Sequence, residues 1–468
     1  MSDRPEVRVT AGKLRGTRES GIAVFRGIPF AEPPVGALRF AAPRPVRHWD
    51  GLREAVEFGP PPPQAGAFGM DAVPGGDDWL TVNVWSPEPS QGAGLPVMVW
   101  IQGGGYGIGM SGLAEYDGAR LARDGVVLVT FNYRVGIEGF ARIEGAPANR
   151  GLLDQVAALE WVRGNIRAFG GDPDLVTVFG QSAGGGSVAS LLVMPLAEGL
   201  FRRAIAQSVP GTYFTPELAG DIAAAFAAEY ELLPTVSQLS TVDPRELPAA
   251  GDEVTAKIGQ RTRWGQAAHR SIPFAPVVDG EVLPTTPWEA SRQVDIIAGH
   301  TRDEQRLFSV IENASAPLEV LAPDARRYRE SFPGVSPDEL LEFVNSDWLF
   351  RMPSLHLAKT GRTYLYELTW SGILGACHGL DVPLVFGNLQ RGQPAMLIED
   401  VAAAEAVSAD MRAAWIAFAT HGDPGWPAYE PEGRLTRIFD TPSTVAAYPE
   451  ETSRLLWQDY AFAPLPLL

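Results

Sequence analysis

The sequence contains very little cysteine and lysine, and it has no long apolar run. Its single cysteine, Cys377, excludes a disulfide within the chain and a zinc site built from several cysteines. Only three lysines occur, and together with the abundance of alanine, glycine and proline this suggests a GC-rich bacterial source. No signal-peptide core precedes residue 20 and no stretch is apolar enough to cross a membrane, so we expect a cytoplasmic protein.

Positive charge is also scarce. There are 56 acidic residues against 38 lysines and arginines, which gives a formal net charge of −18. Such a surface repels nucleic acids and anionic membranes, so neither is an expected partner. Hydrophobic residues make up 45% and charged residues 20%, which is typical of a globular enzyme. We expect a small-molecule partner and a monomer or weak homo-oligomer.

Short apolar runs alternate with helical patterns along most of the chain. Residues 95–101 and 126–133 are nearly continuous apolar runs, as expected of strands buried on both faces. Residues 149–169 repeat apolar positions at three- and four-residue steps and predict a long amphipathic helix. Further strands are expected at 80–85, 175–180, 203–208, 294–299 and 363–370. Further helices are expected within 213–270, 317–360 and 403–419.

This alternation predicts an α/β fold with a mainly parallel central sheet, flanking helices and helical insertions. We assign the whole chain, 1–468, to one domain. Residues 7–30 are expected to form a small antiparallel meander before the sheet. Residues 60–76 should form a surface loop, and a tail rich in proline and glycine is expected to close the chain.

A serine at the end of one predicted strand is the strongest candidate for chemistry. The strand 175–180 runs into Gly180-Gln181-Ser182-Ala183-Gly184, followed by small residues typical of a helix start. Glycines two before and two after a serine permit the sharp turn that exposes its hydroxyl. The backbone N–H of Ala183 would then lie at a helix N-terminus, where a developing oxyanion is stabilised. An incidental serine in a glycine-rich turn is the alternative.

A run of glycines follows the strand 95–101. Gly103, Gly104 and Gly105 could direct backbone N–H groups toward a substrate oxygen. The overlapping Gly107–Gly112 segment fits the dinucleotide-binding pattern G-x-G-x-x-G. That pattern requires an immediate helix and an acidic residue ending the next strand, and neither is evident here. The glycines therefore favour an oxyanion hole over dinucleotide binding.

A base for the serine must come from only six histidines. His378 and His300 each follow a predicted strand, where ligands of such sheets bind. His378 lies in a glycine-framed loop, which suits presentation of a base to Ser182. The remaining histidines precede the sheet, lack a preceding strand, lie in an apolar helical stretch or belong to a surface turn: His48, His269, His356 and His421.

An acid should lie between the serine and the histidine along the chain. Asp303 and Glu304 directly follow the strand 294–299, and the residues alone do not separate them. Asp381 lies too close to His378 in sequence to orient that ring readily. Serine, acid and histidine thus occur in the order found in hydrolases.

Several longer motifs resemble those of type-B carboxylesterases, the family of bacterial p-nitrobenzyl esterases and cholinesterases. The resemblance extends over nearly the whole chain. Besides the elbow around Ser182, the motifs that carry it are residues 25–34, 77–85, 103–106, 132–136, 151–155, 301–304 and 378–383.

The resemblance implies an α/β-hydrolase fold and specific roles for site residues. It places the nucleophile at Ser182, the acid at Glu304 and the base at His378, and so selects Glu304 over Asp303. It implies an oxyanion hole made by the N–H groups of Gly104, Gly105 and Ala183. It further implies the ion pairs Arg39–Asp77 and Arg134–Asp154, and a buried role for Ser208 near the triad.

The chain departs from the family pattern at three positions. Gln102 replaces a histidine before the glycines, which should spare a hole built from backbone groups but alter substrate orientation. Trp79 stands where a cysteine is often found. Gln181 replaces the glutamate that cholinesterases carry before the serine, which removes a negative charge and disfavours a choline-ester specialist.

We therefore expect a serine carboxylesterase that works through an acyl-enzyme without cofactor or metal. Acyl transfer or lactone processing by the same residues is one alternative, and a catalytically silent binding protein is another. The substrate pocket is expected to involve Gln102, Tyr106, Gln181, Trp348, Phe350 and Leu374.

Overall fold

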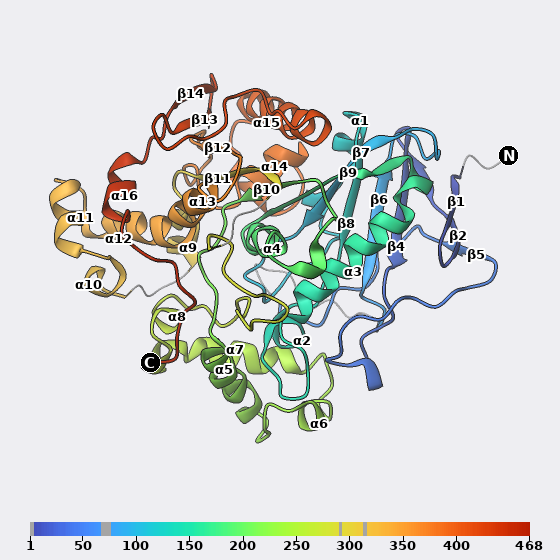
Figure 1. The fold of residues 1–468 in the computed structure, drawn as a ribbon, viewed down its shortest axis with the longest axis horizontal. Helices are drawn as coiled ribbons and strands as arrows, with labels where there is room; N and C mark the ends of the chain where they lie inside the picture. Colours follow the sequence, from blue (N-terminus) through green and yellow to red (C-terminus); the bar gives the residue numbers. More distant parts are fainter. Residues whose placement is uncertain (1–3, 67–75, 290–292, 312–315) are drawn as a thin grey trace.

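A computed structural model describes residues 4–66, 76–289, 293–311 and 316–468, and is built around one large twisted sheet (Figure 1). In spatial order its strands are β14 (Thr444–Ala447), β13 (Leu435–Phe439), β12 (Thr363–Leu368), β11 (Asp295–Thr301), β10 (Arg203–Gln207), β9 (Gly171–Gln181), β7 (Leu95–Ile101), β8 (Val127–Phe131), β6 (Thr81–Ser86), β4 (Ile22–Pro29) and β3 (Thr17–Glu19). From β8 to β13 all neighbours are parallel, and the edge pairs are antiparallel. The expected mainly parallel sheet is confirmed.

Alternate residues of the central strand β7 enter two separate cores. Val97, Val99 and Ile101 pack in a core that includes α3 (Arg150–Asn165), α4 (Ala183–Leu191) and α13 (Met352–Ala358). Met98 and Trp100 point the other way, toward α1 (Ala119–Arg123), α14 (Asp381–Phe386) and α15 (Val401–His421). The pleat places successive side chains on opposite faces, so a strand apolar on both faces requires helices on both.

The helical insertions are confirmed, but each consists of several shorter helices than the sequence suggests. In the first, Figure 1 shows α5 (Pro216–Ala228), α6 (Val236–Leu239), α7 (Leu247–Ala256) and α8 (Gln266–His269) together beneath the sheet. The second contains α9 (Gln305–Ile311), α10 (Leu318–Leu321), α11 (Ala325–Ser331), α12 (Pro337–Ser346) and a π-helical turn over Asp347–Arg351 that leads into α13.

Both ends of the chain differ from expectation. The predicted meander is split: β1 (Glu6–Val9) and β2 (Gly12–Arg15) join β5 (Leu52–Glu54) in a separate sheet, whereas β3 and β4 extend the main one. The expected tail contributes β13 and β14 to the sheet and ends with α16 (Glu451–Leu456). Residues 67–75 of the predicted surface loop lie outside the described residues.

The long helix expected from the sequence is confirmed over most of its length. The helix expected over 149–169 is α-helical to Asn165 and continues as a tighter turn to Phe169, where Gly170 at φ 87° ends it. Among the described residues, no helix is long and apolar enough to cross a membrane.

Of the two ion pairs implied by the resemblance, one is present. Arg134 and Asp154 are fully buried, with Nη2 and Oδ1 2.8 Å apart. The other is wrong, because Arg39 pairs with the buried Glu138 at 2.7 Å. Asp77 lies at the surface and pairs with Arg245 instead. Arg39 is buried and pairs with a carboxylate that is also buried, whereas the side chain of Asp77 is 58% exposed.

Candidate active site

Ser182 lies at a sharp turn between β9 and α4. Its backbone has φ 58° and ψ −128°, which lifts the residue out of both elements. A Cβ on Gly180 would lie 2.6 Å from the Gly184 carbonyl carbon, and one on Gly184 would lie 2.0 Å from the Ile101 oxygen. The two glycines of the elbow are therefore required by close backbone packing. The Ser182 N–H donates to the Gln207 carbonyl at 3.0 Å and ties the turn to β10.

The glycine run after β7 packs against this elbow. A Cβ on Gly103 would lie 2.9 Å from the Gln181 carbonyl oxygen and 3.1 Å from Ser182 Cβ. Gly104 and Gly105 have φ values of 113° and 58°, which favour glycine. Both line the same cavity as Ser182 and Ala183. Ala183 opens α4, where the first N–H groups have no intrahelical partner.

Glu304 and His378 form a short, buried contact. Glu304 Oε2 lies 2.5 Å from His378 Nδ1. The other oxygen, Oε1, accepts hydrogen bonds from the Ser208 hydroxyl at 2.6 Å and the Thr301 N–H at 2.9 Å. Burial opposes ionisation of Glu304, but His378 and these two donors hold its pKa below the usual range. The carboxylate is thus charged and fixed in orientation at neutral pH.

The other two acids considered from the sequence have different contacts. Asp303 pairs with Arg302 at 3.0 Å and accepts the Ala376 N–H at 2.9 Å, which anchors the loop that carries His378. Asp381 is buried and accepts from Gln207 Nε2 at 2.7 Å. Among the described residues, neither makes a hydrogen bond or ion pair with the His378 ring, and Glu304 is the carboxylate that the fold brings to it.

The remaining histidines are placed as follows. His300 lies inside β11 rather than after it, and its Nε2 is 3.1 Å from the Tyr448 hydroxyl. His356 packs edge-on against Phe462. His269, which has no predicted strand before it, lines the same cavity as Ser182.

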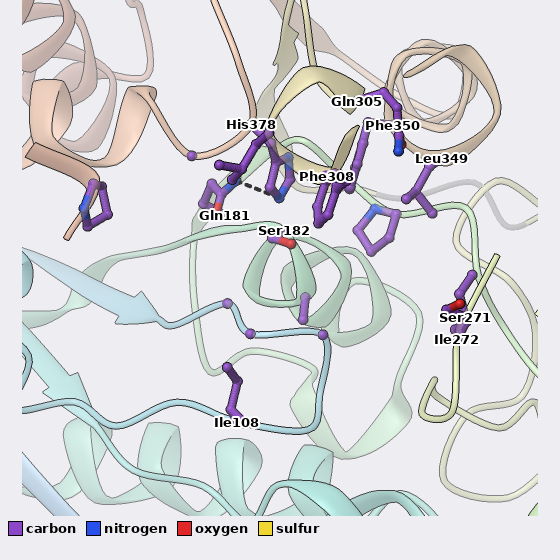
Figure 2. Close-up of a pocket in the computed structure, with 18 of the residues that line it drawn as sticks. Ile108, Gln181, Ser182, Ser271, Ile272, Gln305, Phe308, Leu349, Phe350 and His378 are labelled. Atoms are coloured by element: carbon purple, nitrogen blue, oxygen red, sulfur yellow. Dashed lines mark hydrogen bonds between the residues drawn. The ribbon is translucent and has the colours of Figure 1, made fainter. Parts of the chain in front are cut away.

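Gln181, the residue before Ser182, reaches the other nitrogen of the base. Its Nε2 lies 3.1 Å from His378 Nε2, a contact drawn in Figure 2. When Nδ1 carries the proton toward Glu304, Nε2 holds the lone pair that accepts this amide hydrogen. The Phe350 ring stacks on His378 with centroids 4.3 Å apart, and Phe308 lies at 5.1 Å. The imidazole is therefore held on its edges and on its faces.

A cavity of about 910 Å³ opens in front of these residues. Ser182, His378, Gly104, Gly105 and Ala183 line it, and so do three of the predicted pocket residues: Tyr106, Gln181 and Phe350. Many other lining residues were not anticipated, because they come from the insertions. Among them are Ile108, Arg270, Ile272, Phe308 and Leu349.

Three predicted pocket residues do not line the cavity. Trp348 is 1% exposed and donates from Nε1 to the Tyr460 hydroxyl at 3.0 Å. Gln102 is fully buried at the end of β7, and neither end of its carboxamide has a hydrogen-bond partner among the described residues. Leu374 packs against the core on the α14 and α15 side, and its neighbour Ile373 lines the cavity instead.

The described residues contain no group of three or more histidine, cysteine, aspartate or glutamate side chains placed to hold a metal ion. The groups that the fold brings together here are a hydroxyl, an imidazole, a carboxylate and backbone N–H groups.

Known proteins with similar sequences and structures are esterases. The family model of the carboxylesterase family matches residues 3–450. The para-nitrobenzyl esterase of Bacillus subtilis is 37% identical over 95% of this chain and 96% of its own length. The fumonisin B1 esterase of Sphingopyxis macrogoltabida is 36% identical over 93% of this chain and 87% of its own.

Solved structures agree with these relatives. A PNB esterase superimposes with a TM-score of 0.86 at 35% identity, covering 96% of this chain and 99% of that one. A carboxylesterase of Geobacillus stearothermophilus gives 0.84 at 33% identity, covering 97% of this chain and 100% of that one. The expected α/β-hydrolase fold is confirmed. This chain belongs to the carboxylesterase family and is a carboxylic ester hydrolase.

Proposed function

We propose that the enzyme hydrolyses small carboxylic esters through an acyl-enzyme on Ser182, with His378 as base and Glu304 as the acid that orients it. The observation that carries this proposal is the 2.5 Å contact between Glu304 and His378, on the wall of a cavity that Ser182 also lines. The buried carboxylate stabilises an imidazolium, and the elbow presents the hydroxyl.

In the first step, Ser182 Oγ attacks the carbonyl carbon while His378 Nε2 takes the hydroxyl proton. The N–H groups of Gly104, Gly105 and Ala183 bind the resulting oxyanion. The tetrahedral intermediate collapses, the bond to the alcohol oxygen breaks, and His378 returns the proton to that oxygen. Water then attacks the acyl-enzyme by the same route and releases the acid.

The hydrogen bond from the Gln181 carboxamide to His378 Nε2 must break before that nitrogen can accept the serine proton. Once the imidazole is protonated, the same side chain can turn its oxygen toward the new N–H. Gln181 thus acts on the reaction through His378, as a positioning residue. No cofactor or metal takes part in this scheme.

The test compares the wild type with Ser182→Ala on 4-nitrophenyl acetate and butyrate, without added metal. Loss of a triad serine costs on the order of 10⁶ in kcat. Ser190→Ala is a matched control, because Ser190 is also a buried serine of α4 and bonds to the Gly186 carbonyl and Tyr213. Equal rates for wild type and Ser182→Ala would overturn the proposal. Product analysis with competing alcohols separates hydrolysis from acyl transfer.

A further inference from the structure

Arg270 is a half-buried charged residue of the cavity wall, and its hydrogen bonds and its ring contact are all with neutral groups. Its Nε donates to Gln266 Oε1 and its Nη2 to the Leu321 carbonyl, both at 3.1 Å. Its Nη1 donates to Asn345 Oδ1. The Trp348 ring covers the guanidinium, with Cζ 4.0 Å from the ring centroid. An amide, a carbonyl and an aromatic face orient the cation but leave its charge uncompensated.

Other arginines with little exposure do not line the cavity. Arg134 lies 2.8 Å from the carboxylate of Asp154. Arg150 and Arg203 lack such a partner among the described residues, but they donate to backbone carbonyls away from the cavity. Among the described residues, no carboxylate lies within 4.0 Å of Arg270, although the chain has 56 acidic residues. Arginines are seldom buried without such a partner.

Burial therefore acts on Arg270 with little opposition. It lowers the pKa of the guanidinium to about 9, because the cation loses hydration and only the hydroxyls of Tyr460 and Tyr328 act in its favour. A guanidinium carries five N–H donors, and three of its hydrogen bonds are accounted for above. The spare donors suit a carboxylate, which binds such a fork more strongly than a neutral acceptor.

We propose that Arg270 binds a carboxylate that the ester substrate carries at a distance from the bond to be hydrolysed. This inference rests on the proposed function and adds the substrate class. Arg270 contacts Asn345 of α12 and the Trp348 ring, whereas Ser182 lies at the elbow before α4. The anion and the scissile carbonyl must therefore be separated by a spacer, and the cavity of about 910 Å³ has room for one.

A carboxylate of the protein on another wall of the cavity favours the same orientation of the bound substrate. Glu115 also lines the cavity, and it is only 6% exposed. It lies beside the segment after α14, where a Cβ on Gly392 would approach it to 2.2 Å. An anion there would face like charge, whereas an anion at Arg270 meets opposite charge. Asp338 and Glu342 of α12 also line the cavity, so Arg270 is the one arginine or lysine among the described lining residues that can pair with the carboxylate of the substrate.

The experiment uses pairs of esters that differ only in charge. One pair is the mono-4-nitrophenyl ester of suberic acid and the same compound methylated at its free carboxyl. A second pair places the carboxylate in the alcohol part: 6-(butyryloxy)hexanoate and its methyl ester. The quantity measured is the ratio of kcat/KM for the anionic ester to that for its neutral partner.

We expect the wild type to prefer the anionic ester of at least one pair, and Arg270→Gln to lower that ratio by about tenfold or more. Arg270→Lys keeps the charge and should retain most of the preference. Arg263→Gln is the matched control, because Arg263 is an exposed arginine of the same insertion already paired with Asp221, and its ratio should not change.

Two outcomes overturn the inference. In one, the wild type has no preference for either anionic ester. In the other, Arg270→Gln lowers kcat/KM by the same factor for both esters of a pair. The second result would mean that Arg270 only links the insertions. Calorimetric titration of Ser182→Ala with suberate dianion and neutral suberamide gives a readout without turnover, with binding of suberate alone expected. Binding without hydrolysis by the wild type would overturn the proposed function and leave this inference standing.

Discussion

The carboxamide nitrogen of Gln181 lies 3.1 Å from Nε2 of His378, the nitrogen that must take the serine proton in the proposed reaction. The substitution Gln181→Glu places a carboxylate at the same distance and favours the protonated imidazole. We expect the acidic limb of the kcat/KM profile to move about one unit to higher pH, since an opposite charge within hydrogen-bond distance has an effect of this order. Profiles that superimpose would contradict this. Gln155→Glu, at another buried glutamine beside Ser187, is a control for adding a buried charge.

Ser208 is expected to act through Glu304. Its hydroxyl donates to Oε1 at 2.6 Å, opposite the oxygen that contacts His378. Ser208→Ala removes one of two donors to a buried carboxylate and should lower kcat by about tenfold with little change in KM. Ser408→Ala is the control, because that buried serine donates to the Leu384 carbonyl away from the site and should leave kcat unchanged. A normal kcat for Ser208→Ala would show that the Thr301 N–H orients Glu304 unaided.

Gly184→Ala tests the backbone packing of the elbow. The added Cβ would lie 2.0 Å from the carbonyl oxygen of Ile101 at the end of β7, so the turn must shift or the variant fails to fold. We expect loss of activity and a large fall in the free energy of unfolding. In contrast, Gly164→Ala at an exposed position of α3 meets nothing within 4 Å and should stabilise the protein by about 0.5–1 kcal/mol. An active, stable Gly184→Ala variant would refute the packing argument.

Asp381 predicts a pH dependence of stability. Burial raises its pKa from 3.8 to about 6 in the folded state. Between these values the folded protein holds more protons than the unfolded chain, so the free energy of unfolding falls as pH rises through this window. Above about pH 6 the full cost of ionising the buried group, about 3 kcal/mol, is present.

The variant Asp381→Asn does not titrate, so its stability relative to wild type should increase by about 2 kcal/mol from pH 4 to pH 7, because part of the effect is already present at pH 4. Urea denaturation across this range measures the difference. Asp459→Asn, at an exposed aspartate, should give a constant difference. A constant difference for Asp381→Asn as well would show that this carboxyl is not held protonated by the fold.

The centre of the sheet was readily predictable because its strands carry a strong local pattern. Residues 95–101 and 126–133 are apolar on both faces, which few other structures explain. The C-terminal strands lack this pattern. All four residues of β14 are exposed, so nothing in their sequence distinguishes them from a loop, and their place depends on pairing with β13.

The candidate triad was predictable because its motifs are local, whereas the pocket was not. The residues alone could not separate Asp303 from Glu304, since adjacent side chains point in different directions that only the fold reveals. The π-helical turn over Asp347–Arg351 changes the phase of the helix, so Phe350 faces the cavity while Trp348 is buried behind Arg270. A regular periodicity cannot locate such a shift in advance.

Ser182 has a backbone conformation, φ 58° and ψ −128°, that lowers the stability of the fold at the residue proposed as the nucleophile. A residue other than glycine held in such a conformation costs of order 1–3 kcal/mol, which the rest of the fold must offset. Glycine at position 182 would relieve that cost and also remove the hydroxyl. Selection for thermal stability alone would therefore tend to discard the serine, and its presence in a conformation better suited to glycine reflects a requirement for function.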